Sequence, residues 1–586
     1  MKGPPAQQLE LRQLTEATSQ VNREKIYFDR WDLIALLALT AVAFILRFLS
    51  PIMPDFFVHP FQGPAITDCV PNTPINPQGD PGTLCGLAYP FNRGYPDQNK
   101  VLSPPNGQVF DEIYFPVDAR IDFKNTQCQS HSIYCPYFDP EPPLAKLFIG
   151  AGMWGYGWYR ATFQGASGAY IDLGFNTFGW RIAACIFGTL CIPMMYLFAR
   201  RLWPNRLFAI SAATFACFDG MFFIQSRIGM IDIFPIFFIL LAYFLYLVHI
   251  QSRTQASSLA SLVALGVVLG IGVASKWIVL AAFASIVFLL IVRAIRHNVD
   301  FHIGPPGNPI WSWGRGEGST IPGGAWWPTY LVIAVVALAV IPVAIYVASW
   351  YPFFARGQFQ NLADLIAYQK ASFDYHATLK ATHPYGSPWW SWPLLARPVL
   401  YYAEYTNLGV DHWTGEALIS RMSNLGNPWI WWTSLPCVVS LPYFIVRHKS
   451  FPATVILLGF ITQWLPWSQI SRVIFMYHMF GGLIFMVLAL AFVLVKLSEQ
   501  LQASGRRLLV FNHLALAVVF FFYFYPVWTG LPISGPASVA SCAVTSRFWA
   551  TCSSLSPNTP PWGPKTWLVY CPTNVRPDQP QLFCWN

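Results

Sequence analysis

Long apolar stretches separated by short polar connections run through most of this chain. About eleven of these stretches approach the roughly 20 apolar residues that a helix needs to cross the hydrocarbon core of a bilayer. They lie near residues 32–50, 179–199, 207–224, 230–250, 258–274, 277–293, 326–349, 428–446, 452–467, 473–495 and 508–528. The pattern predicts an all-α integral membrane protein with a bundle of about eleven transmembrane helices.

Two polar interruptions, at about 51–178 and 350–427, are longer than connections between neighbouring helices usually are. The end of the first, residues 144–159, mixes Leu, Phe, Met, Trp and Tyr with Lys146. This composition predicts a helix that lies on the membrane surface. We therefore divide the chain into a polar tail (1–31), a multi-span domain (32–528) and a second tail (529–586).

The basic residues predict which side of the membrane each loop occupies. If the N-terminus is cytoplasmic, twelve Lys and Arg residues fall in the short loops on the cytoplasmic side. The short connections on the other side hold only Arg227, Lys276 and Arg472. Since cytoplasmic loops are enriched in basic residues, both long loops and the second tail are expected outside.

The cysteines give an independent indication of the same topology. Four fall in the first outer loop and four in the second tail: Cys69, Cys85, Cys128, Cys135, Cys542, Cys552, Cys571 and Cys584. Two even sets on an oxidising side are typical of disulfides, although the sequence leaves their pairing open.

The composition argues against a soluble protein and against a nucleic-acid-binding protein. Only 11% of the 586 residues are charged, whereas a soluble protein carries roughly 25%. The formal charge of +9 is spread over loops, and no Lys or Arg run suggests binding to nucleic acid. The partners expected are therefore the lipid bilayer and molecules that meet it.

Two adjacent acids, Asp111 and Glu112, stand among aromatic residues in the first outer loop. They could be a solvated turn, or a catalytic carboxylate that takes a proton from an acceptor hydroxyl. The three outer cations could be anchors at helix ends, or could hold a phosphate at the membrane surface. Acids and cations on one side favour group transfer from a lipid phosphate.

Further candidates lie around this site. Asp139 and Glu141 form a second acidic pair, for which a stiff proline-rich turn is the simpler reading. Trp389 and Trp390 fit either an aromatic belt at the headgroups or a wall around a sugar or lipid, and His383 precedes them. No metal-ligand spacing is present, so no metal site is predicted.

At these residues the sequence resembles the protein O-mannosyltransferases, most closely the shorter prokaryotic members, within the multi-span GT-C glycosyltransferases. The resemblance covers about residues 28–535. Its motifs occur in order: Phe110-Asp111-Glu112, Phe138-Asp139-Pro140-Glu141-Pro142-Pro143, Phe178-Gly179-Trp180-Arg181, Gln225-Ser226-Arg227 with Asp232, Ser275-Lys276-Trp277, His383-Pro384-Tyr385, Ser387-Pro388-Trp389-Trp390, Gly426-Asn427-Pro428, and Trp464-Leu465-Pro466-Trp467 with Arg472. Eukaryotic members have His-Pro-Pro where this chain has Glu141-Pro142-Pro143.

The resemblance implies transfer of mannose from a polyprenyl or dolichyl phosphate to Ser or Thr hydroxyls of secreted or membrane proteins, near the translocation machinery. It implies that Asp111 is the catalytic carboxylate, that Glu112 supports it and that Arg227 engages the lipid phosphate. Lys276 and Arg472 are added as phosphate or lipid contacts. No cofactor is required, and a divalent cation is compatible with the reaction.

Two alternatives remain open. A related enzyme could move another sugar or act on a lipid acceptor. A transporter or a non-catalytic scaffold would form a different class. The expected location is a prokaryotic cell membrane, with the active site outside.

Overall fold

A computed structural model gives the fold for residues 28–49, 108–128, 131–252, 254–298, 301–303, 311–313, 327–381, 383, 385–404, 418–530 and 533–534. The helices that form the bundle are α2 (Arg30–Phe44, continued by the π-helix η1, Ile45–Leu49), α7 (Thr177–Leu202), α8 (Arg206–Cys217), α9 (Gly220–Gln225), α10 (Ile233–Gln251), α11 (Gln255–Ser275), α12 (Val279–Asn298), α13 (Trp327–Val335, continued by the π-helix η5, Val336–Val340, and by α14, Ile341–Ser349), α17 (Pro428–His448), α18 (Phe451–Trp464), α19 (Phe480–Glu499) and α20 (Ala503–Thr529).

Eight helices in the described part of the chain are long and apolar enough to cross a membrane. They include α2, α7, α10, α11, α17, α19, α20 and the α13–η5–α14 rod. The apolar helix α8 and the Val279–Ile295 stretch of α12 are shorter. Helix α8 ends early because Asp219 caps a new helix, α9, through the backbone N–H groups of Met221 and Phe222. A membrane protein with many helices is confirmed, but the count of eleven is not.

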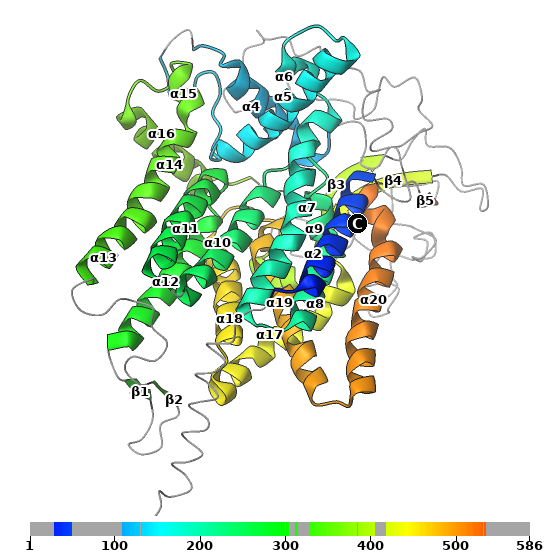
Figure 1. Ribbon diagram of the computed structural model, residues 1–586. Helices are drawn as coiled ribbons and strands as arrows, with labels where there is room; N and C mark the ends of the chain where they lie inside the picture. Colours follow the sequence, from blue (N-terminus) through cyan, green and yellow to red (C-terminus); the bar gives the residue numbers. More distant parts are fainter. Residues whose placement is uncertain are drawn as a thin grey trace, which may run out of the picture.

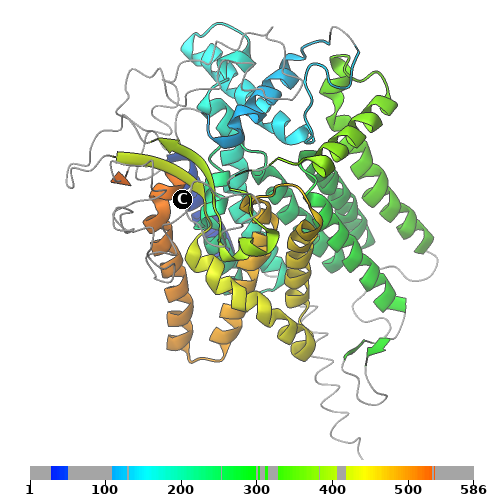
Figure 2. The same cartoon turned by 180° about the vertical axis from the view of Figure 1, so that it is seen from behind.

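The bundle is built around α19, nearly all of whose residues are buried. Helices α8, α10, α17, α18 and α20 pack against it, while α7 joins α2, α8 and α10 on the neighbouring side (Figure 1). The α13–η5–α14 rod stands at one edge of the bundle and exposes Val332, Val340 and Val343 (Figures 1 and 2). Apolar side chains exposed along such a rod are suited to contact lipid.

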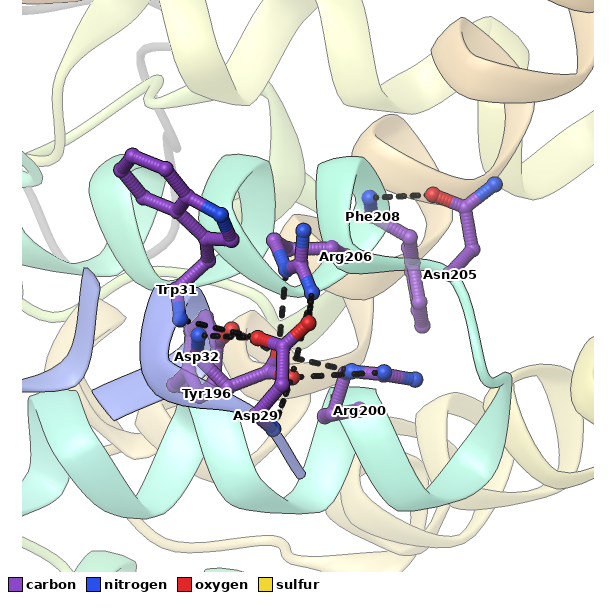
Figure 3. Close-up of polar contacts among 8 residues, drawn as sticks. All are labelled: Asp29, Trp31, Asp32, Tyr196, Arg200, Asn205, Arg206 and Phe208. Atoms are coloured by element: carbon purple, nitrogen blue, oxygen red, sulfur yellow. Dashed lines mark hydrogen bonds and ion pairs between the residues drawn. The ribbon is translucent and has the colours of Figure 1, made fainter. Parts of the chain in front are cut away.

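A polar clamp fixes the start of α2 (Figure 3). The Asp29 side chain caps the helix by accepting from the N–H groups of Trp31 and Asp32. Asp32 is buried and accepts from Arg200 Nε at 2.9 Å and from the Tyr196 hydroxyl at 2.6 Å. Because Arg200 and Tyr196 belong to α7, this clamp sets the depth of α2 beside α7.

A layer of short elements covers the opposite end of the bundle (Figure 1). It consists of the 3-10 helix η3 (Phe110–Ile113), α4 (Phe115–Lys124), α5 (Leu144–Gln164), α6 (Tyr170–Leu173), α15 (Tyr351–Ala355), α16 (Leu362–Thr378) and three further 3-10 helices, η6 (Trp389–Leu394), η7 (Leu465–Gln469) and η8 (Met476–Met479). The predicted surface helix at 144–159 is α5, which extends to Gln164.

Two small sheets complete the described fold. Strands β3 (Val399–Glu404), β4 (Leu418–Asn424) and β5 (Ile533–Ser534) pair antiparallel beside this layer, and β1 (Phe301–Ile303) pairs with β2 (Trp311–Trp313) at the far end (Figure 1). The β3–β4 register shifts between Leu400 and Tyr402, which leaves Tyr401 at a bulge. Such a bulge can change the direction of a side chain, here that of Tyr401.

One buried ion pair and two hydrogen bonds fix the segments of the two long loops. Arg356 Nη1 lies 2.6 Å from Asp122 Oδ1, and the Tyr137 hydroxyl donates to the same oxygen at 3.0 Å. The Tyr368 hydroxyl on α16 donates to the Asp139 carbonyl at 2.7 Å. The segment around 122–139 is therefore held against α15 and α16, which come from the second loop.

Candidate active site

The helix η3 carries Asp111 and Glu112 at the boundary between the covering layer and the bundle. Phe110, which precedes them, has a φ of +52°, a left-handed conformation that is rare for an aromatic residue. Its ring stacks on Tyr401 with centroids 4.5 Å apart. Strained backbone of this kind often marks a functional site, because surrounding contacts must hold it in place.

Glu112 is fully buried and saturated with donors. Arg181 binds it through two parallel contacts, Nε to Oε1 and Nη2 to Oε2, each 2.7 Å long. The backbone N–H groups of Val109 and Gly229 donate to the same carboxylate at 2.8 and 2.5 Å. Because the Glu112 carboxylate already accepts four hydrogen bonds, it is not available to accept a proton from a substrate. Its role is to hold η3 against α7 and the α9–α10 connection.

Asp111 has the opposite environment. It is half-buried, and no side chain or backbone group in the described part of the chain hydrogen-bonds or pairs with its carboxylate. Burial, followed by the charge of Asp232, raises the pKa of Asp111 to about 7; Lys276 opposes this rise and Glu141 adds to it. A carboxyl with free oxygens and a near-neutral pKa is suited to take up a proton at physiological pH.

The connection between α9 and α10, residues 226–232, links the groups around this pair. Gly229 reaches Glu112 as described, and an added Cβ there would come within 2.8 Å of Trp180 Cδ1. Arg227 is buried, donates from Nε to the Arg47 carbonyl at 3.3 Å and lies 5.0 Å from the Phe223 ring centroid. Residues 226–232 thus donate a hydrogen bond to Glu112 and also carry Arg227, the predicted phosphate ligand.

Of the three predicted cations, Lys276 and Arg472 act through their charges on the same two histidines, His376 and His478. Lys276 follows α11 and pairs with Asp232, with its Nζ 2.8 Å from Oδ1. Its charge acts on Asp111, whereas Arg227 lies among Arg47 and Arg181. Arg472 lies after η7 and its charge acts on His376 of α16.

Aromatic rings line the Asp111 side of the site. The Tyr477 ring meets Phe110 edge-on at 6.1 Å, and the Lys276 ammonium lies 5.9 Å from the Tyr477 ring centroid. The Tyr401 hydroxyl accepts from Gln225 Nε2 at 2.8 Å. Burial and then the charges of Asp232, Tyr477 and Asp111 raise the pKa of Tyr401, which therefore stays a neutral phenol beside the carboxylates.

The second acidic pair divides between two tasks. Asp139 is buried and forms an ion pair with the fully buried Lys146 of α5. Glu141 is half-buried, and its charge acts on both Asp111 and Lys276. Glu141 therefore belongs to the site, while Asp139 fixes the segment before α5 through its ion pair with Lys146.

The aromatic segment of the second long loop packs on the elements around η8. Trp389 meets Trp464 at 4.7 Å and accepts its indole N–H through the backbone carbonyl at 3.0 Å. Trp390 is exposed. His383 is also exposed and lies edge-on to Phe475 at 5.0 Å, just before Met476 opens η8. Their roles toward a sugar or acceptor stay predictions.

Of the eight candidate disulfide cysteines, the structure describes Cys128 and Cys135; the other six lie outside the described residues. Both are thiols, and their side chains interact with each other. Burial, followed by that interaction, raises the pKa of Cys128 to about 12. Among the described residues no group of His, Cys or acidic side chains is arranged to hold a metal ion.

The sequence analysis did not identify two members of the site. Asp232 stands in a family motif without a role assigned to it, and Tyr401 lies outside the motifs. A motif gives order along the chain, whereas these residues meet Asp111 only through folding of α10 and β3. Aspartate is common at the start of a helix, so the sequence does not indicate that Asp232 pairs with Lys276.

Two family models match: "Dolichyl-phosphate-mannose-protein mannosyltransferase" over residues 122–356, and "C-terminal four TMM region of protein-O-mannosyltransferase" over residues 361–547. Asp111 lies just before the first match.

Relatives and a solved structure agree with this match. The polyprenol-phosphate-mannose–protein mannosyltransferase of Mycobacterium tuberculosis is 26% identical over 482 residues, covering 74% of this chain and 85% of the relative. The Corynebacterium glutamicum enzyme of the same name is 24% identical over 447 residues, covering 67% of this chain and 78% of the relative. The S. cerevisiae Pmt1-Pmt2 complex bound to the sugar donor shares the fold, with a TM-score of 0.60 at 14% identity over 88% of this chain and 92% of that chain. The chain therefore belongs to the protein O-mannosyltransferase family and has the GT-C membrane glycosyltransferase fold.

Proposed function

We propose that this protein transfers mannose from a polyprenyl phosphate to Ser or Thr hydroxyls of secreted or membrane proteins. Family membership and the names of the relatives support the reaction class. The observation that carries the assignment of the base is the contrast between two neighbouring acids. Glu112 is saturated by Arg181 and two N–H groups, while Asp111 is free in the described structure and has a pKa raised to about 7.

In the proposed reaction the acceptor oxygen attacks C1 of the mannose. The new bond joins that oxygen to C1, the bond between C1 and the phosphate oxygen breaks, and direct displacement inverts the anomeric centre. Asp111 takes the hydroxyl proton as general base. The polyprenyl phosphate leaves with the bonding electron pair, and fixed positive charge stabilises it.

For the phosphate we propose Arg227, with Lys276 and Arg472 as further phosphate or lipid-side contacts. Arginine offers a planar fork that matches two phosphate oxygens, and Lys276 brings a point charge into the Asp111 surroundings. The proposed orientation places the N-terminus in the cytoplasm of a prokaryotic cell and the η3 layer outside. This orientation rests on the bias of basic residues.

The test uses purified full-length protein, radiolabelled polyprenyl-phosphate mannose, and either a Ser/Thr-rich peptide or a lipid as acceptor. Label should enter the peptide, and Asp111→Asn should lower kcat by about 10²–10⁴-fold, the usual size of a general-base contribution. Asp374→Asn is the matched control, because Asp374 is exposed on α16 and pairs only with Lys370 among the described residues. Transfer to lipid alone would refute the acceptor assignment, and an active Asp111→Asn variant would refute the base.

A further inference from the structure

Helix α16 exposes a narrow stripe of large apolar side chains. Leu362, Ile366 and Phe373, which we call the apolar stripe, are 58%, 69% and 63% exposed. At about 100° per residue, Ile366 and Phe373 lie within about 40° of Leu362 around the helix axis. The exposed pair of Lys370 and Asp374 lies further round, at about 80° and 120° from Leu362. The exposed part of α16 is therefore divided into the apolar stripe and a charged strip.

Another face of α16 is fixed to the layer that covers the bundle. Leu365, Tyr368 and Ser372 are buried on this face. The Tyr368 hydroxyl accepts from the Asp139 backbone N–H and donates to the Asp139 carbonyl, each at 2.7 Å. The Tyr368 ring also meets the buried Trp350 ring with centroids 5.2 Å apart. Because a rotation of α16 that buried the apolar stripe would break these contacts, the stripe stays on the surface of the described fold.

Gln369 fixes the level of α16 relative to the transmembrane helices. It lies about 20° from Leu362, at the edge of the apolar stripe. Its Oε1 accepts from the Tyr346 hydroxyl at 2.6 Å, and this hydroxyl accepts from Trp277 Nε1 at 3.1 Å. Tyr346 belongs to the last turn of the α13–η5–α14 rod, and Trp277 lies just after the end of α11. Both the rod and α11 are apolar and long enough to cross a membrane, so α16 lies at the level where two spans end (Figures 1 and 2).

We propose that the apolar stripe of α16 inserts into the interfacial region of the bilayer, on the side of the η3 layer. Lipid is the occupant, because the stripe begins beside Gln369 at the end of two spans and because the adjoining rod also exposes apolar side chains, among them Val340 and Val343. The charged strip lies about 100–140° from Gln369 and faces away from the rod, as expected of an amphipathic helix in a membrane interface. Since Tyr368 binds the backbone of Asp139, this contact sets the height of the 139–141 segment above the bilayer.

The test uses the full-length wild-type protein in lipid nanodiscs. The nanodiscs contain a phosphatidylcholine with a photoreactive diazirine near the carbonyl end of one acyl chain, and labelled residues are identified by mass spectrometry after irradiation. Label should appear on Ile366 and Phe373, and also on the exposed valines of the α13–η5–α14 rod. It should be absent from Ala367, which is exposed as well but lies about 100° from Ile366 around the helix.

Variants separate lipid contact from general exposure. Ile366→Asp and Phe373→Asp each place a charge in the apolar stripe, and a charge is costly to insert into lipid, so label should be lost from α16. The rod should keep its label in both variants and serves as the internal control for folding and insertion. Ala367→Asp is the matched control, because it adds the same charge on the side of the charged strip and should leave the labelling of α16 unchanged.

A wild-type protein that carries label on the rod but none on the apolar stripe would overturn the inference, as it would if a second copy of the chain or a polypeptide acceptor covered the stripe. Equal label on Ala367 and Ile366 would overturn it too. If the stripe variants fail to fold, the wild-type labelling pattern alone decides. The result does not depend on the proposed mannose transfer, and loss or retention of activity in Asp111→Asn bears only on that proposal.

Discussion

The clamp between Glu112 and Arg181 should be essential for stability, whereas Asp111 should be dispensable for it. Both members of the clamp are buried, with side chains 0% and 1% exposed. Glu112→Gln would leave the Arg181 guanidinium buried with its charge uncompensated. Removing one partner of a buried pair usually costs about 3–5 kcal/mol. Asp111→Asn removes no hydrogen bond found in the described structure, so its stability should remain close to that of the wild type.

A double-mutant cycle measures this difference. Thermal unfolding in detergent can be followed by the fluorescence of the 25 tryptophans, for the wild type, Glu112→Gln, Arg181→Met and the double variant. The double variant should be less destabilised than the sum of the single ones, since it leaves no unpaired charge. A Glu112→Gln protein that unfolds at the wild-type temperature would refute the reasoning. So would an Asp111→Asn protein that is as unstable as Glu112→Gln.

Three further outcomes follow from the site. Arg227→Lys should lower kcat in the mannose-transfer assay, because an ammonium cannot make two parallel phosphate contacts; unchanged kinetics would reduce Arg227 to an anchor. The thiols of Cys128 and Cys135 interact in the structure, so an oxidising side of the membrane should convert them to a disulfide, detected as a cross-linked peptide in non-reducing mass spectrometry; two alkylated thiols would contradict this. Phe110→Ala removes the ring stacked on Tyr401 and should lower the free energy of unfolding by at least about 0.5–1.5 kcal/mol, the usual contribution of such a pair; an unchanged unfolding temperature would oppose this.

The sequence predicted more of the architecture than of the site. Apolar length alone indicated the helices of the bundle, because crossing a bilayer demands about 20 apolar residues whatever the fold. The same rule did not reveal the break after α8, where Asp219 caps a second helix inside a single apolar run. Length along the chain cannot reveal such a break, since the capping contacts depend on where the side chain points.

The roles of the site residues show the same limit. Asp111 and Glu112 are adjacent acids in the sequence, and within the sequence only the family resemblance assigns them different roles. Folding brings Arg181 and Gly229 to one carboxylate and leaves the other free, a distinction made by residues 69 and 117 positions away.

What the sequence determined by itself was the membrane class, the family motifs and the presence of acids and cations in the connections between the apolar stretches. These depend on composition and local order, which the chain carries directly. The tertiary structure alone decided that Glu112 is a clamp, that Lys276 rather than Arg227 acts on Asp111, and that Asp232 gives up its helix cap to pair with Lys276. Electrostatic roles depend on distance and burial, and these are set when α7, α10 and α11 pack together around η3.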